Sequence, residues 1–203
     1  MATTRTATFS TADTGPLVQR LLAEEGAELA AWAADPDGSP RLALRVTFDE
    51  PLGTVTVRGA DQPVEAADLV VVLAVEQEAP QVRSAHPETT PGWSLGRDST
   101  LRQLGSGAVS TRCPFPALQQ LALCWLGQDW AADGAATVQE ALLAWRAADA
   151  SDLPSRVHGE VSGLRAGASG DEPAVAGVLA DLGMAAPYTD PVQVLDEIAV
   201  AAA

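Results

Sequence analysis

Seven consecutive apolar residues, Leu69–Val75, constrain the fold of this 203-residue chain more than any other feature. A run of this length without polar alternation is typical of a strand covered on both faces. Upstream, apolar and polar residues alternate from Arg41 to Phe48 and again from Thr54 to Arg58, as in half-buried strands. Because a short turn-like segment separates these two strands, we expect them to form an antiparallel hairpin beside the central strand.

Helical periodicity dominates the rest of the chain. Apolar residues recur at helical spacing over residues 14–34, and Pro116–Leu126 is apolar nearly all round, which predicts a buried helix. Thr137, Asp171 and Asp190 each precede a further helical pattern and suit the N-cap position. The sequence therefore predicts an α+β fold, with an N-terminal helix and an antiparallel β-hairpin or meander followed by a helical C-terminal half.

The expected domain organisation follows from composition. Residues 1–13 are Thr/Ala-rich and are expected to be a flexible N-terminus, followed by an α+β core over 14–150. Prolines and glycines predict a long irregular segment at 80–114 within that core. A Gly/Ser-rich connector is expected at 151–170. The helical pair at 171–203 is too small to be stable alone, so we expect it to dock on the core.

The charge balance limits the classes of partner. The chain has 27 acidic and 12 basic residues, a net charge of −15, which opposes nucleic-acid binding and favours encounter with a basic protein. All basic residues are arginines, a bias typical of a bacterial GC-rich genome. No apolar run reaches the roughly 18 residues of a membrane span, and no secretory leader is recognisable, so the expected location is the cytoplasm.

Residues 89–128 differ from the rest of the chain. Asp98 is the single acidic residue among them, whereas Arg97, Arg102 and Arg112 are basic. These arginines, together with a Gly-Ser-Gly turn, form a candidate anion site, because backbone N–H groups and guanidinium groups both bind anions. The turn consists of Gly105, Ser106 and Gly107. The alternative is that the arginines pair with acidic residues elsewhere, and no nucleotide-binding motif is present.

Cys113 is the one candidate nucleophile. It follows Arg112 and precedes a helix, and both a neighbouring cation and a helix start favour a thiolate. Covalent catalysis also needs a base, and the only histidines, His86 and His158, are distant in sequence. The alternative is a small side chain that packs at the start of a helix. The His and Cys spacing predicts no metal site, and no cofactor is expected.

Two further groups of residues are candidate partner contacts. Trp93 and Trp130 lie in predicted loops, where exposed tryptophans often anchor interfaces. Arg41, Arg45 and Arg58 share one face of the predicted hairpin. They form either a docking face or a solvated surface paired with acidic residues.

Three functional hypotheses follow. The first is a non-enzymatic, acidic protein-binding module, comparable to an immunity protein or a secretion chaperone, that engages a basic protein partner. The second is an anion-binding domain or Cys-dependent enzyme with its site in residues 89–128. The third is a homo-oligomeric structural subunit.

Overall fold

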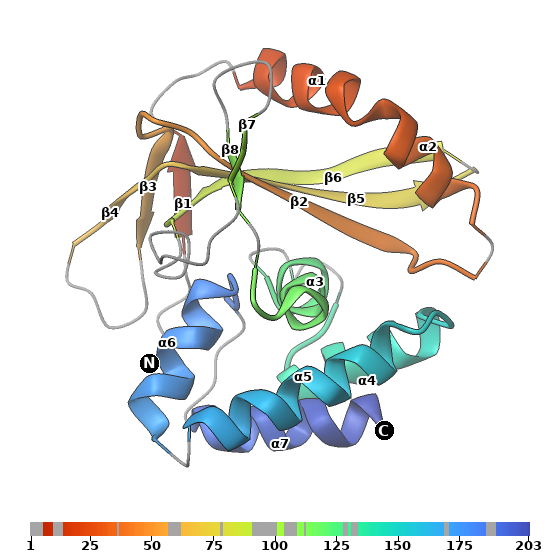
Figure 1. The fold of residues 1–203 in the computed structure, drawn as a ribbon, viewed down its shortest axis with the longest axis vertical. Coiled ribbons are helices and arrows are strands. Elements are labelled where there is room, and N and C mark those ends of the chain that lie inside the picture. The colour runs from red at the N-terminus through yellow and green to blue at the C-terminus, as the bar shows by residue number, and fades with distance from the viewer. Residues whose placement is uncertain are drawn as a thin grey trace. The chain divides into compact units, whose positions relative to one another are not determined.

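The computed structural model divides the chain into two compact units, Thr6–Pro114 and Phe115–Ala203 (Figure 1). The residues it describes are 6–9, 14–35, 37–56, 62–77, 79–90, 101–103, 109–111, 113–127, 130, 134–168, 171–185 and 190–203. All described strands lie in the first unit, and the helices of the second unit follow them, so the predicted α+β class is confirmed. The boundary between the units, after Pro114, lies within residues 14–150, which we expected from the sequence to form one core.

The strands of the first unit form two antiparallel sheets. The smaller has the order β1-β3-β4, and the larger has the order β6-β5-β2-β8-β7. Their bounds are β1 Thr6–Phe9, β2 Arg41–Thr47, β3 Gly53–Thr56, β4 Val64–Ala66, β5 Asp68–Glu76, β6 Ala79–Glu88, β7 Leu101–Gln103 and β8 Val109–Thr111.

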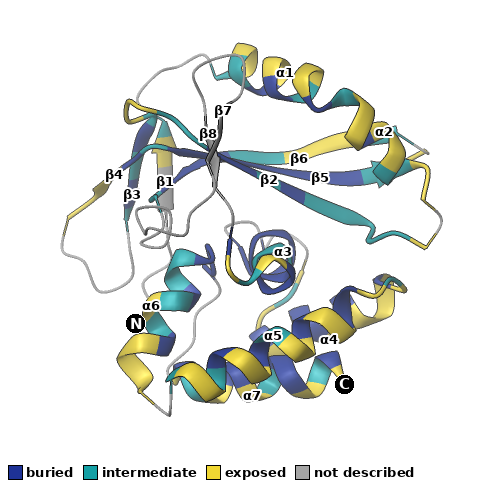
Figure 2. Ribbon diagram, viewed as in Figure 1, coloured by how far each residue is buried: buried dark blue, intermediate teal, exposed yellow. Residues whose placement is uncertain are grey.

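Strand β5 is the centre of the core, as its apolar run predicts. Each residue of Leu69–Leu73 is at most 5% exposed, and β2 and β6 pair with its two edges (Figure 2). The register sets Leu44 opposite Val71 and Val46 opposite Leu69, so both strands turn apolar side chains to one face. Helices α1 (Gly15–Glu24) and α2 (Gly26–Ala33) pack on that face. Their buried contributions are Val18, Leu21 and Leu29.

The predicted hairpin is wrong in its pairing, although both of its strands exist. β2 pairs with β5 and β8, whereas β3 pairs with β1 and β4 in the other sheet. β5 pairs with β2 over seven residues, six of them apolar, and β8 pairs with the other edge of β2, so β3 has no edge of β2 to join. Adjacency in sequence is only a tendency in strand pairing.

The expectation of a single helix over residues 14–34 is also corrected. Glu25 interrupts the helical residues and separates α1 from α2. Gly26 begins the second helix, and glycine has a low intrinsic preference for helix interiors. Glu25 is buried, and its carbonyl oxygen accepts a hydrogen bond from the Leu29 N–H.

The expectation of irregular chain from residue 80 is wrong for residues 80–88, which belong to β6. Prolines are tolerated there because β6 is an edge strand, so one side of it needs no ladder hydrogen bonds. A register shift opposite Val72 and Leu73 marks an irregularity in the same strand pair. Two short strands, β7 and β8, also lie within the range 80–114.

The second unit contains five described helices. They are α3 Pro116–Trp125, α4 Val138–Ala148, α5 Leu153–Ala168, α6 Glu172–Asp181 and α7 Pro191–Ala202. The predicted burial of α3 is confirmed, and so are the three predicted N-caps. The Thr137 hydroxyl accepts from the Glu140 N–H, the Asp171 carboxylate from the Ala174 N–H and the Asp190 carboxylate from the Val192 N–H. None of the described helices has the length and hydropathy that crossing a bilayer requires.

The expected connector at 151–170 is wrong, because α5 occupies most of it. Leu153, Val157, Val161 and Leu164 recur at helical spacing and are all buried. The glycines and serines of this segment lie on the opposite, largely exposed face, where they do not disturb packing. Composition obscured the period of the apolar residues.

One side chain of α5 completes the start of α3. The Glu160 carboxylate accepts hydrogen bonds from the backbone N–H groups of Ala117, at 3.1 Å, and Leu118, at 2.8 Å. These two donors belong to the first turn of α3, where the helix has no carbonyl partners for them. A negative charge is also favourable at that end of the helix. The contact therefore joins two helices that are about forty residues apart in sequence.

Two glycine substitutions test this description of the backbone. A Cβ added at Gly163, inside α5, meets nothing within 4 Å, so Gly163→Ala is expected to raise the free energy of unfolding by about 0.5–1 kcal/mol. A Cβ added at Gly53 would overlap the Thr8 carbonyl oxygen and the Pro87 ring, so Gly53→Ala is expected to lower it by about 1–3 kcal/mol. Urea denaturation measures both, and a destabilising Gly163→Ala would contradict the α5 assignment.

Candidate functional site

An open groove with a largely apolar lining lies between α4 and α7. Its volume is about 480 Å³. The lining residues are Gln139, Leu142, Leu143, Arg146, Gln193, Asp196, Glu197, Val200 and Ala201. All of them belong to the helical unit, so the groove is formed within one compact body.

Helix α4 is held at both ends. Thr137 caps its first turn, and the Glu140 carboxylate accepts a hydrogen bond at 2.7 Å from the N–H of Ala136, the residue before the cap. At the other end the fully buried Trp145 donates its indole N–H to the Asp149 carboxylate at 3.1 Å. With Trp145 directed inward, Gln139, Leu143 and Arg146 lie on the exposed side of α4, and the buried Leu142 borders the groove from the core side.

Helix α7 is fixed in the same manner. The Asp190 carboxylate accepts hydrogen bonds from the N–H groups of Val192 and Gln193. Val194, Leu195 and Ile198 are buried, as their spacing predicts. The opposite side of the helix carries the groove residues from Gln193 to Ala201.

Two apolar side chains of the groove are unusually exposed. Val200 is 79% exposed and Leu143 is 63% exposed, against 44% for Val64 and 43% for Val82, the other large apolar residues exposed among those described. Single exposed apolar residues are ordinary on a protein surface. Two that line one groove form an apolar patch, and such patches often mark binding surfaces.

Charged residues border the groove. Asp196 forms an ion pair with Arg165 of α5. Glu197 accepts a hydrogen bond from the Gln193 amide at 2.9 Å, and this neutral donor leaves the negative charge of Glu197 in place. Arg146 lies on the α4 side. The α7 border is therefore acidic, and the α4 border is basic.

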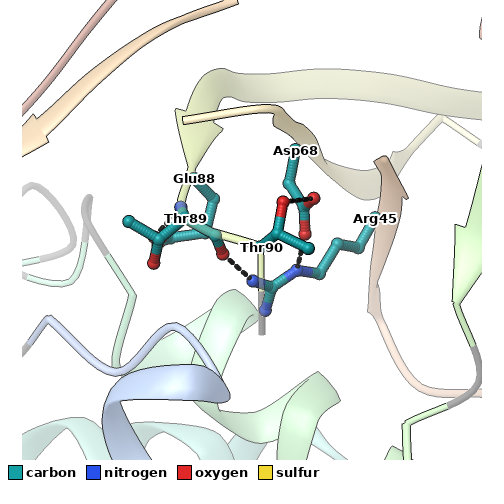
Figure 3. Close-up of polar contacts among 5 residues, drawn as sticks. All are labelled: Arg45, Asp68, Glu88, Thr89 and Thr90. Atoms are coloured by element: carbon teal, nitrogen blue, oxygen red, sulfur yellow. Dashed lines mark hydrogen bonds and ion pairs between the residues drawn. The ribbon is translucent and has the colours of Figure 1, made fainter. Parts of the chain in front are cut away.

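The first unit contains a different polar feature, a buried ion pair (Figure 3). Arg45 of β2 donates from Nε to the Asp68 carboxylate of β5 at 2.7 Å, and their side chains are 4% and 0% exposed. Nη2 of Arg45 also donates to the Thr89 carbonyl oxygen at 2.6 Å, and the Thr90 hydroxyl donates to Asp68 at 2.9 Å. Glu88 accepts from the Thr89 N–H at 2.7 Å. The network attaches the end of β6 to β2 and β5.

Burial raises the pKa of Asp68 above its ordinary value of 3.8, because removal from water disfavours the charged form. The positive charge of Arg45 and the hydrogen bonds to this carboxylate oppose that effect without cancelling it. Asp68 therefore binds its proton more tightly in the folded protein than in the unfolded chain.

The candidate residues predicted from the sequence, where the structure describes them, belong to two different units. Arg45 is buried with Asp68, and Arg41 is half-buried on the same strand. Trp130 is 8% exposed and, with Trp125, lines a cavity of about 220 Å³ beside α4. The thiol of Cys113 is buried. Arg41, Arg45 and Cys113 belong to the first unit and Trp130 to the second.

The remaining candidates lie outside the described residues. They are Arg58, Trp93, Arg97, Gly105, Ser106, Gly107 and Arg112. Arg102 lies in β7, where the structure describes only the backbone. Among the described residues, no group of three or more His, Cys, Asp or Glu side chains is placed to hold a metal ion.

Sequence reasoning missed the groove residues. Leu143 follows Leu142 directly but lies outside the inward stripe of α4, which consists of Val138, Ala141, Leu142 and Trp145. Val200 similarly lies outside the inward stripe of its helix. The available signal was therefore an apolar residue left over after each inward face had been assigned.

Comparisons with known proteins give no family. No protein-family model matches the chain, and no curated protein matches it. Among solved structures the chain is similar to one in the crystal structure of the CdiA-CT/CdiI complex from Y. kristensenii 33638, with a TM-score of 0.37 and 11% identity. The similarity covers 43% of this chain and 80% of that one. A likeness this weak assigns neither a family nor a function.

Removing one member of the buried ion pair should be costly. Arg45→Met and Asp68→Leu each leave an unpaired buried charge, so each is expected to lower the free energy of unfolding by about 3–5 kcal/mol. The double variant should lose less than the sum of the two, because it leaves neither charge. Urea denaturation of all four proteins measures the coupling. Arg20→Ala removes an exposed pair with Glu24 and serves as the control, with an expected change below about 1 kcal/mol.

The raised pKa of Asp68 gives a pH dependence with a definite sign. The folded state binds the Asp68 proton more tightly than the unfolded state, so this group's contribution to stability falls as pH rises from about 3.8 through the raised pKa. The free energy of unfolding of the wild type minus that of Asp68→Asn should therefore decrease with pH across that window and then become constant. A difference that increases with pH would mean that Arg45 outweighs burial.

Proposed function

We propose that this chain is a non-enzymatic, acidic protein-binding module that engages a basic protein partner. Its role would be to neutralise or escort that partner, as an immunity protein or a secretion chaperone does. The observation that carries the proposal is the α4–α7 groove, whose apolar lining includes the exposed side chains of Leu143 and Val200. The finer class, immunity protein or chaperone, rests on size and charge.

The groove supplies a source of binding free energy. Full burial of a leucine or valine side chain stabilises by about 1.5–3 kcal/mol. Because Leu143 and Val200 are largely exposed, most of this free energy is still available when a partner buries them. Association costs part of this gain in lost translational and rotational freedom. The apolar contact therefore needs support from complementary charge.

The net charge of −15 supplies that support for a basic protein. Opposite charges accelerate encounter and favour the correct partner, more strongly at low salt. A second copy of this chain would instead bring another −15 to the interface. Charge therefore favours a basic protein over self-association in the groove. The second hypothesis, a site in residues 89–128, has no supporting contact among the described residues.

The test is affinity capture of the tagged protein from its host lysate at low salt, followed by mass spectrometry. The wild type should retain one basic protein in stoichiometric amount, and the variant with Leu143→Gln and Val200→Gln should lose it. Glutamine keeps the helix and the charge, so thermal melts of this variant should match the wild type.

Val82→Gln is the matched control, because Val82 is another exposed valine but belongs to the first unit. It should retain the partner. Equal capture by the groove variant and the wild type would remove the groove from the function. A wild type that captures no protein would contradict the proposal itself.

A further inference from the structure

We infer that the α4–α7 groove receives an amphipathic helix of the partner, with its basic flank directed to α7. This inference rests on the proposed function and specifies the form of the bound segment. It follows from the spacing of the lining residues, from the state of the backbone in the groove and from the charges on its two borders.

The lining positions have helical spacing on both sides. On α4 they are 139, 142, 143 and 146, and on α7 they are 193, 196, 197, 200 and 201. Each helix therefore presents one face over two turns, about 10–12 Å at the usual rise per residue. Rows of side chains spaced by three and four residues are the ridges between which another helix packs.

The backbone of the groove disfavours an extended segment. A strand binds by adding to exposed backbone N–H and C=O groups at a sheet edge. Both walls here are α-helices, whose interior backbone groups are already hydrogen-bonded. A proline-rich segment prefers an aromatic groove, and none of the nine lining residues is aromatic. In helix-in-groove binding, apolar anchors of the bound helix at i, i+3, i+4 and i+7 enter a hydrophobic groove. Here Leu142, Leu143, Val200 and Ala201 provide that apolar surface.

The charges on the borders orient the bound helix. On the α7 border the charge of Asp196 is compensated by Arg165, whereas Glu197 contacts the neutral Gln193 amide. On the α4 border Arg146 repels a cation. Lysines or arginines of the partner helix are therefore best placed on its α7 side, beside Glu197. Ala201 on that side is small and leaves room for their long side chains.

Three fluorescein-labelled peptides test this inference. The probe is an amidated peptide of about 18 residues, or five turns, with leucines on one face, lysines along one flank and alanines elsewhere. The second peptide replaces each lysine with glutamate. The third has the composition of the probe in an order that distributes the leucines around the helix. Fluorescence anisotropy measures affinity, and far-UV circular dichroism measures helix formation on binding.

The probe should bind the wild type and become helical, and the other two peptides should bind about ten-fold more weakly or worse. The variant with Leu143→Gln and Val200→Gln should weaken binding of the probe by about ten-fold or more, whereas Val82→Gln should have no effect. Glu197→Gln should weaken it several-fold at low salt, and Arg146→Gln should strengthen it. Equal binding of the probe and either comparison peptide would overturn the inference.

Failure of this inference is distinguishable from failure of the proposed function. If the probe does not bind but capture of the natural partner still depends on Leu143 and Val200, the helix inference is wrong and the proposed function stands. If capture is indifferent to the groove, the groove has no part in the function. Sedimentation of the free protein tests whether a second copy of this chain occupies the groove. A dimer that dissociates in the groove variant would replace the partner helix with a second copy of this chain.

Discussion

The burial of β5 on both faces is the constraint on which the first unit depends. A strand whose residues from Leu69 to Leu73 are all excluded from water needs a partner on each edge and a cover over each face. β2 and β6 satisfy the edges, and α1 and α2 cover one face. β2 has β5 along one edge and β8 along the other, so β3 pairs in a separate sheet. The buried Arg45–Asp68 pair lies across the same β2–β5 ladder and adds a specific contact to an otherwise apolar arrangement.

Sequence reasoning succeeded where one physical signal decided the structure. The apolar run of β5, the all-round burial of α3 and the caps at Thr137, Asp171 and Asp190 all depend on local properties, and all were predictable. Pairing was not predictable, because the partner of β2 is decided by competition between distant strands. In α5 the glycines and serines outweighed the spacing of Val157 and Val161 in the reading of the sequence, although those glycines lie on the exposed face. Average composition is a poor guide when the two faces of a helix have different compositions.

The residues of the candidate site were also not predictable from the sequence. Sequence reasoning sought function in distinctive residues, namely arginines, tryptophans and a cysteine. Among the described ones, Arg45, Trp130 and Cys113 are all buried. The groove instead consists of ordinary residues whose significance is positional. Leu143 and Val200 differ from the core residues beside them only by a rotation about the helix axis, and that rotation depends on the neighbouring helices.

The Glu160 contact at the start of α3 has a consequence for the order of folding. The first turn of α3 is complete only when a carboxylate from α5 reaches the N–H groups of Ala117 and Leu118. Closing the intervening loop of about forty residues carries an entropic cost that local helix formation does not. The helical unit therefore cannot assemble its most buried helix by local steps alone. We therefore expect the first turn of α3 to gain these two hydrogen bonds only after α5 has formed and docked, and thus after residue 160 has been synthesised.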